Sequence, residues 1–463
     1  MAAIRAKKAD SSLLEGPIFM RVLRFALPLI VTNLLQALYT AADMMIVGLS
    51  GVEGAIGSIG TCNAMLALLV AVFIGFSVGA DVVVARNIGA QDRDATERAV
   101  HTSIVVGAVF GFAAAVIGEF ACRPILVALG NQGYILDLAT VYARIYIAGA
   151  PAMCLTNYAA AVYRAKGDSQ TPMRVLSIAG VCNVLLNLLF VLAFGMSVDG
   201  VALATLLSNV ISAFWLLWGL MREDGWCRLV PQKLGVSKTE FWQIIRIGVP
   251  AGIQRALFSL ANLVVQSSVV TMNNELYPGG SAVLDAHAAG ASLEHIPWVI
   301  EDGVNQASVT FVSQHVGAQK YDRLKRVIAV LYLVTFLVAE GSALLFILFR
   351  HPLVSLYVQG EAAELAAARL VITLSCYFTL GFMDTGSGIL RGLGKSLTST
   401  IIALLGSCAL RVVWLMTVFW IPEYHTLDTI YVAYPITWSV ATVAMFTAIV
   451  INMRKLRKQI KGY

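Results

Sequence analysis

The second half of this 463-residue chain repeats the first, and this feature most constrains its fold. Three segments return in the same order about half a chain length later. The first pair is RFALPLIVTNLLQALYTAADMMIV from Arg24 and RIGVPAGIQRALFSLANLVVQSSV from Arg246. The second pair is NIGAQDRDATERAV from Asn87 and HVGAQKYDRLKRVI from His315. The third pair is VYRAKGDSQT from Val162 and ILRGLGKSLT from Ile389. Such a repeat predicts two halves of similar fold that can enclose a central site.

Each half is too apolar for a soluble domain. Hydrophobic residues make up 58% of the chain and charged residues 13%, whereas soluble domains carry about a quarter charged residues. The apolar runs are continuous rather than alternating, and they are long enough to cross the roughly 30 Å of a bilayer core as helices. Residues 1–17 lack the apolar core of a cleavable signal. We therefore expect an all-α integral membrane protein.

Apolar runs and the breaks between them predict twelve transmembrane helices in two six-helix lobes. Their expected ranges are 18–47, 54–86, 98–120, 135–162, 171–195, 199–221, 240–272, 283–315, 327–349, 361–390, 397–421 and 427–453. The corresponding domains are an N-terminal segment 1–17, an N-lobe 18–222, a linker 223–239, a C-lobe 240–453 and a basic tail 454–463. Because each lobe has an even number of helices, the repeat is parallel, with its axis along the membrane normal.

The basic residues predict the orientation. Most of the 33 lysines and arginines fall in loops and segment ends that would share one face of the membrane. Examples are Lys7 and Lys8, Arg93 and Arg98, Arg164 and Lys166, Arg228 to Lys238, Lys320 to Arg326, and Arg454 to Lys461. The opposite loops hold only Arg123 and Arg350. The positive-inside rule then predicts a multi-pass protein with both termini in the cytoplasm, and the basic excess needs no nucleic-acid partner.

Motifs of enzymes and of ATP-driven pumps are absent from the sequence. It contains no P-loop and no HExxH, and GFSVG at 75–79, which has the GxSxG spacing, lies inside a predicted membrane helix rather than at a strand-to-helix turn. The seven cysteines form no CxxC pair and lie mostly within apolar segments, as small buried residues do. We expect no enzymatic activity, no metal site and no cofactor other than a coupling ion, H⁺ or Na⁺.

Asp43 is the strongest candidate for ion coupling. Charged groups within the hydrocarbon region are costly and usually face a cavity or a partner. Asp43 lies in the first predicted helix with no basic residue near it in sequence, and Thr32, Gln36 and Tyr39 share its helical face. A carboxyl group in a low dielectric can be neutral or charged at physiological pH, so it can exchange a proton or Na⁺ for a cationic substrate. The alternative is a structural acid bonded to neighbouring helices.

Two asparagines and a proline complete the candidates of the first half. Asn183 and Asn187 lie one turn apart in the fifth predicted helix, where they either line the cavity of Asp43 or bond helix to helix. Pro28 and Pro250 occupy equivalent positions in the first helix of each half. A proline within a helix removes a backbone hydrogen bond, so Pro28 is either a hinge or a static kink.

The second half has Val265 in place of Asp43 and carries its charges on other helices. Its candidate site residues are Gln254, Arg255, Glu301, Asp302 and Asp384. Arg255 can pair with either Glu301 or Asp302, which leaves the remaining acid free to titrate. A purely structural ion pair is the other interpretation.

The sequence resembles the multidrug and toxic compound extrusion (MATE) transporters, prokaryotic DinF-like branch. The resemblance rests on LLEGPIFMRVLRFALPLIVTNLLQALYTAADMMIVG from Leu13, the GAQ loops at Gly89 and Gly317, YRAKGDSQTPM from Tyr163 and LRGLGKS from Leu390. It extends from Leu13 to about Lys455. It implies a V-shaped, two-lobed antiporter that exports organic cations in exchange for H⁺ or Na⁺.

Carried over residue by residue, the resemblance gives Asp43 the role of the coupling acid in the N-lobe. Asn183 matches the asparagine of the family's fifth-helix NxxxD pattern, but Asn187 stands where many relatives have aspartate. Thr40 stands where an asparagine is common. Phe258 and Leu380 occupy the positions of the C-lobe acids of other branches, and Asp384 is out of register with the second. The coupling scheme of those branches therefore does not transfer.

Together these observations predict an H⁺-coupled exporter of amphipathic organic cations, with Na⁺ as the alternative ion, in the inner membrane of a prokaryote. We expect it to act as a monomer. The alternatives are a lipid- or oligosaccharide-flipping transporter of the same superfamily, suggested by Arg255, and a passive channel or receptor that needs no ion gradient.

Overall fold

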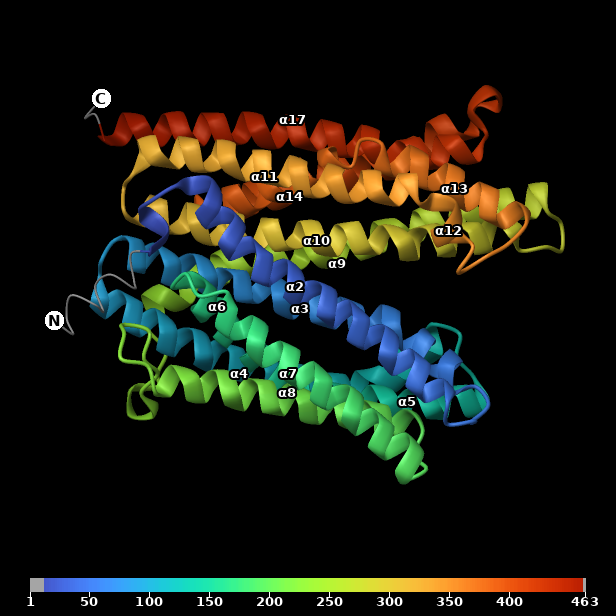
Figure 1. Ribbon diagram of the computed structural model, residues 1–463, viewed down its shortest axis with the longest axis horizontal. Helices are drawn as coiled ribbons and strands as arrows, with labels where there is room; N and C mark the ends of the chain where they lie inside the picture. Colours follow the sequence, from blue (N-terminus) through green and yellow to red (C-terminus); the bar gives the residue numbers. More distant parts are fainter. Residues whose placement is uncertain (1–11, 461–463) are drawn as a thin grey trace. The chain divides into compact units, whose positions relative to one another are not determined.

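The computed structural model describes residues 12–460, and this part of the chain is built from helices without a β-strand (Figure 1). The predicted segment 1–17 and basic tail 454–463 therefore lie partly outside the described residues. The helices are α2 (Ile18–Gly48), α3 (Ala55–Gly89), α4 (Arg93–Ala128), α5 (Gly133–Ala148), α6 (Ala150–Ala165), α7 (Gln170–Leu188), α8 (Val198–Met221), α9 (Lys238–Leu276), α10 (Ala282–Gly317), α11 (Tyr321–Leu348), α12 (Arg350–Val354), α13 (Glu361–Leu374), α14 (Phe378–Gly392), α15 (Ser396–Ala403), α16 (Leu410–Thr417) and α17 (Leu427–Ile460).

The described residues contain nine helices, counting α15 to α16 as one run, that are long and apolar enough to cross a membrane. Two bent pairs, α5 with α6 and α13 with α14, raise this number to eleven. The twelfth predicted segment is α10, a 36-residue helix that falls outside this set. Many of its polar side chains, including Glu301, Asn305 and Gln314, are buried, so protein contacts rather than lipid surround them.

Two of the predicted continuous helices are broken. The helix expected over 135–162 bends by 44° between α5 and α6, and the helix expected over 361–390 bends by 49° between α13 and α14. The second break leaves backbone N–H groups without their usual helical acceptors. The Glu340 carboxylate on α11 accepts a hydrogen bond from one of them, the Phe378 N–H, at 3.1 Å. Two π-helical turns, Leu189–Ala193 and Leu404–Ala409, interrupt the helices expected over 171–195 and 397–421. Apolar periodicity alone does not reveal such bends.

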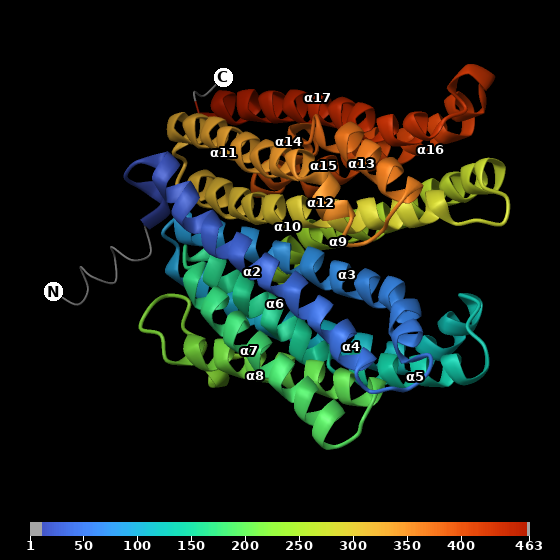
Figure 2. The same ribbon diagram turned by 45° about the vertical axis from the view of Figure 1, so that its right-hand side comes forward.

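The chain forms two compact units whose limits differ from the predicted lobes. Of the described residues, unit 1 contains 12–15, 31–252 and 317–319, and unit 2 contains 16–30, 253–316 and 320–460. Helices α2 and α9 are therefore divided, each two residues after its proline, Pro28 or Pro250. In unit 1, α6 packs against α3, α4 and α8, and in unit 2, α14 packs against α11 and α17 (Figures 1 and 2).

Paired glycines explain why the first part of α9 belongs to unit 1. Gly75 and Gly79 on α3 face Gly248 and Gly252 on α9, and a Cβ at Gly75 or Gly79 would overlap the backbone of α9. Small residues four apart allow two helix backbones to approach this closely in a membrane. The beginning of α9 is therefore held in unit 1 by direct backbone packing.

The first part of α2 is held in unit 2 by different contacts. The rings of Phe25 and Phe311 meet edge to face with centroids 5.6 Å apart. A Cβ at Gly303 of α10 would come within 2.9 Å of the Ile30 backbone nitrogen, so the two helices touch here. Arg323 donates a hydrogen bond to the Gly16 carbonyl at 2.6 Å.

The two GAQ motifs end their helices in the same way. Gln91 and Gln319 adopt left-handed backbone conformations, with φ of 59° and 54°. The N–H groups of Asp92 and Lys320 then reach back to the carbonyls of Asn87 and His315, at 3.1 Å in both cases. These bonds satisfy carbonyls at the helix C-termini, so both motifs are helix caps.

Candidate functional site

Unit 1 brings Asp43, Asn183 and Asn187 together. Asn187, fully buried on α7, donates from Nδ2 to Asp43 Oδ1 at 2.5 Å. With its amide nitrogen turned toward the carboxylate, Asn183 also donates to Asp43 Oδ1, at 2.9 Å, and accepts the Thr205 N–H at 3.3 Å. Two amides from one helix face therefore hold the half-buried carboxylate of another helix.

The polar residues that share the helical face of Asp43 have different surroundings. The Tyr39 hydroxyl donates to the Ser177 carbonyl at 3.0 Å, and its ring lies against Gly180, one turn before Asn183. Thr40 is exposed and bonds back to the Gln36 carbonyl of its own helix at 3.0 Å. Gln36 is exposed as well, whereas Thr32 is buried. Tyr39 is thus the member of this stripe that fixes α2 to α7 beside the carboxylate.

Sequence reasoning missed three residues at this site. Thr205 on α8 bonds Asn183, and the phenols of Tyr142 and Tyr146 on α5 lie close enough to Asp43 to interact with its charge. Tyrosines and threonines are common in apolar helices, so nothing in the sequence distinguished them. Helix packing alone places them beside the acid.

Unit 2 contains a second buried cluster of charged groups. Arg255 donates to Asp302 Oδ1 at 2.8 Å, which selects Asp302 rather than Glu301 as the ion-pair partner. Asn305 and Gln306 also donate to Asp302, at 3.1 Å and 2.8 Å. The Asp302 carboxylate is therefore well satisfied, as a buried charge must be.

Glu301 and Asp384 are the other acids predicted for this half. Glu301 on α10 is fully buried, and neither of its carboxyl oxygens has a hydrogen-bond partner among the described residues, while Asp384 lies on α14. Gln254, the remaining candidate, lies in a polar network. It accepts a hydrogen bond from Arg391 at 3.0 Å and donates to Ser387 at 3.2 Å.

Two further acids among the helices have evident structural partners. Glu294 pairs with Arg369 through two oxygens, at 3.2 Å and 2.8 Å, and Asp81 pairs with Arg164 at 3.4 Å. Across the residues that the structure describes, no group of His, Cys, Asp and Glu side chains is arranged to hold a metal ion.

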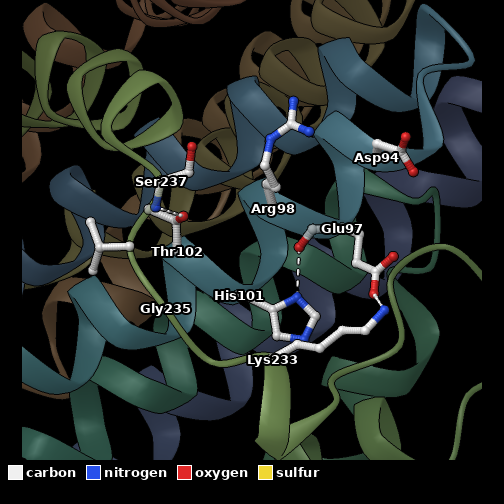
Figure 3. A pocket seen from close by; sticks show the side chains of 9 residues that line it. Asp94, Glu97, Arg98, His101, Thr102, Lys233, Gly235 and Ser237 are labelled. Atoms are coloured by element: carbon white, nitrogen blue, oxygen red, sulfur yellow. Dashed lines mark hydrogen bonds and ion pairs between the residues drawn. The ribbon is translucent and has the colours of Figure 1, made fainter.

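A cavity of about 420 Å³ lies between the first turns of α4 and the linker before α9 (Figure 3). Its polar side chains bind one another. Lys233 pairs with Glu97 at 2.6 Å, and His101 connects the Glu97 carbonyl, at 2.7 Å, to the Val230 N–H, at 3.0 Å. These contacts fasten the linker to α4, so we assign the cavity a structural role.

Nine to eleven helices of the described residues are long and apolar enough to cross a membrane, and each unit places a carboxylate among them, as is typical of a multi-pass membrane transporter. The MatE family matches the chain twice, over residues 28–189 and 250–417, and the chain therefore belongs to this family of transporters, which are not enzymes. The two matches begin at Pro28 and at Pro250, so the family pattern has the same two-fold repeat as the sequence.

Relatives match along nearly the whole chain. The probable multidrug resistance protein YoeA of Bacillus subtilis is 27% identical over 91% of both chains. The probable multidrug resistance protein NorM of Thermotoga maritima is 26% identical over 83% of this chain and 82% of its own. A solved multidrug resistance MATE transporter, described as outward-facing, superposes with a TM-score of 0.89 at 21% identity, covering 97% of this chain and 99% of its own. At that identity the likeness shows the fold.

Proposed function

We propose that this transporter exports amphipathic organic cations in exchange for H⁺, with Asp43 as the coupling acid. The observation that carries the proposal is the setting of Asp43 in unit 1. Within the described residues its carboxylate is bound by amides rather than by a cationic side chain. Its negative charge is therefore left available to a cation. The names of the relatives, which refer to multidrug resistance, are consistent with a broad range of substrates.

The amide arrangement favours H⁺ over Na⁺ as the coupling ion. Asn183 and Asn187 both turn N–H groups toward the carboxylate, whereas a hard cation is bound by oxygen ligands. Asn187 also replaces the second carboxylate found in many relatives. A proton needs only the Asp43 oxygen itself, and its binding cancels the charge that attracts the substrate. Protonation from outside would then release the cation, and deprotonation toward the cytoplasm would restore the site.

Efflux from reconstituted vesicles tests this proposal. Vesicles carrying the wild-type protein should move ethidium, a planar organic cation, when a pH gradient is imposed, and should stop when a protonophore collapses it. Asp43→Asn should abolish the pH-driven component. The matched control is Asp137→Asn, which removes an exposed acid paired with Arg123 and should leave efflux unchanged. Unchanged efflux by Asp43→Asn would refute the role of Asp43, and flux that survives the protonophore would indicate a passive pathway.

Sodium dependence is measured in the same vesicles. We expect equal rates in sodium and choline buffers at a fixed pH gradient, and efflux driven by a sodium gradient alone would reverse the assignment of the ion.

The alternative expectation of a lipid or oligosaccharide flippase rested on Arg255. Because Arg255 is paired with Asp302 at 2.8 Å, it no longer offers a free cation to a phosphate group.

A further inference from the structure

Arg411 on α16, in unit 2, is a buried cation without an acid partner. The residue is only 5% exposed, and among the described residues no carboxylate lies within ion-pair distance of it. Its hydrogen bonds are long and go to neutral oxygens, those of Asn262 at 3.5 Å, Ser407 at 3.3 Å and Thr437 at 3.5 Å. Its Nε–H group is buried and has no acceptor in this part of the chain. The donors of the guanidinium are therefore poorly satisfied.

Other buried arginines of unit 2 have better partners. Arg255 and Arg369 each pair with a carboxylate at 2.8 Å, and Arg391 donates to the Gln254 side chain at 3.0 Å. A buried charge is normally paired and hydrogen-bonded in this way, because removing it from water is costly. Arg411 has neither an acid partner nor a hydrogen bond as short as these.

Aromatic rings hold the Arg411 guanidinium without neutralising it. Its central carbon lies 4.0 Å from the centre of the Tyr434 ring and 6.0 Å from that of Trp438, both on α17. A cation–π contact stabilises a guanidinium by less than the cost of burying its charge. A net positive charge therefore remains at this position, where an anion would offset it.

A polar face of α9 leads to this guanidinium. Asn262, whose side-chain oxygen accepts the Arg411 bond, is exposed. Ser259 and Gln266, one turn before and one turn after it, are exposed on the same side of the helix. Polar side chains within membrane helices face protein or water rather than lipid. This face thus provides an approach for a polar ligand.

We propose that Arg411 binds a carboxylate group, at the junction of α9, α16 and α17. A guanidinium donates two parallel N–H bonds to a carboxylate, and the single charges of the two groups cancel. The Ser407 hydroxyl, 3.3 Å from the guanidinium, offers a further donor. A phosphate monoester carries more than one negative charge at neutral pH, so one guanidinium does not neutralise it. The site goes beyond the proposed cation export, because it takes a group of the opposite charge.

Thermal unfolding of the purified full chain in detergent, with acetate as the probe, tests this site. When sodium acetate replaces sodium chloride at constant ionic strength, the wild-type midpoint should rise and then saturate, because a ligand bound by the folded state stabilises it. Arg411→Gln should remove the rise. In chloride this variant should melt no lower than the wild type, since it deletes an unneutralised charge. The control Arg350→Gln removes an arginine that donates to the Ile347 carbonyl and should keep the rise.

A second substitution separates charge from shape. Arg411→Lys keeps the positive charge but loses the planar pair of donors, so half of the rise should need a several-fold higher acetate concentration. This variant and the wild-type titration also decide the question if Arg411→Gln does not fold.

Several outcomes would overturn the proposal. These are no saturating rise in the wild type, the same rise in Arg411→Gln, and a lower midpoint of Arg411→Gln in chloride, which would mean that the rings and hydroxyls already satisfy the cation. A larger rise with inorganic phosphate than with acetate would replace the carboxylate by a phosphate ligand. Because the measurement needs neither transport nor an ion gradient, Asp43→Asn should respond like the wild type. Failure of the export proposal is therefore distinguishable from failure of this one.

Discussion

At the scale of single residues, Gly180 shows how one missing methyl group positions a functional side chain. The Tyr39 ring occupies the space where a Cβ of residue 180 would lie, and its hydroxyl bonds Ser177 on the same helix. This contact places α2 beside α7 one turn from Asn183. The geometry of the Asp43 site therefore depends on a residue that carries no chemistry.

We expect Gly180→Ala to displace the Tyr39 ring and weaken pH-driven efflux. Overpacking of this kind costs about 1–3 kcal/mol, so the thermal midpoint in detergent should fall as well. Tyr39→Ala removes the ring, and in that background Gly180→Ala should cost little, because the clash no longer exists. Additive losses in the double variant would show that the two residues do not interact.

His425 provides a test of pH-dependent stability outside the membrane-crossing segments. The Phe419 carbonyl and the Glu275 carboxylate, at 2.9 Å and 2.8 Å, raise its pKa above the ordinary value of about 6.5. A raised folded-state pKa stabilises the fold below the unfolded pKa, and this contribution is lost as the pH rises through the folded pKa.

The thermal midpoint of the wild type should therefore exceed that of His425→Gln at about pH 6, and the difference should shrink toward about pH 9. His425 is partly exposed and Glu275 about half exposed, so solvent screens the pair and we expect an effect below about 1 kcal/mol. Glu275→Gln should reduce the pH dependence in part. A difference that grows with pH would contradict the assigned direction of the shift.

At the scale of elements, glycine spacing decides which helix surfaces meet. Helix α3 carries glycines along its length, but they differ in surroundings. Gly79 lies against the Ile244 carbonyl of α9, whereas no heavy atom lies within 4 Å of a Cβ at Gly60. The same residue type thus serves backbone packing at one position and has no contact at the other.

Alanine at the two positions should therefore have opposite effects. Gly79→Ala must push α9 away and should lower stability by about 1–3 kcal/mol. Gly60→Ala fills open space and gains helix propensity, worth at most about 1 kcal/mol. Thermal unfolding in the same detergent measures both. Equal effects would mean that the close approach of α3 and α9 does not contribute to stability.

At the scale of the whole molecule, the charge distribution makes a topological prediction. An even number of crossings places both termini and the linker 223–239 on one side, and the basic residues assign that side to the cytoplasm. A fluorescent protein that matures only in the cytoplasm should fluoresce when fused after Tyr463 or inserted in the linker. Inserted between α9 and α10, at residues 277–281, it should stay dark, and the reverse pattern would overturn the orientation.

Much of the fold was predictable because hydrophobicity is a local property. The length of each apolar run predicted the membrane helices, and the sequence similarity between the two halves predicted the structural repeat. The Asp43, Asn183 and Asn187 group was also predictable, since polar residues stand out in apolar helices. The bends within helices could not be predicted from the sequence. At the break at 374–378, for example, Glu340 from another helix accepts a hydrogen bond from a backbone N–H group.

The sequence by itself determined an all-helical membrane protein built twice, with one acid in its first helix. Tertiary structure alone decided which partners each buried charge receives. It paired Arg255 with Asp302, left the buried Glu301 carboxyl without a hydrogen-bond partner among the described residues, and brought Thr205 and two tyrosines to the Asp43 site. The physical reason is that hydrophobicity acts residue by residue, whereas the state of a buried charge depends on neighbours that packing brings from distant parts of the chain.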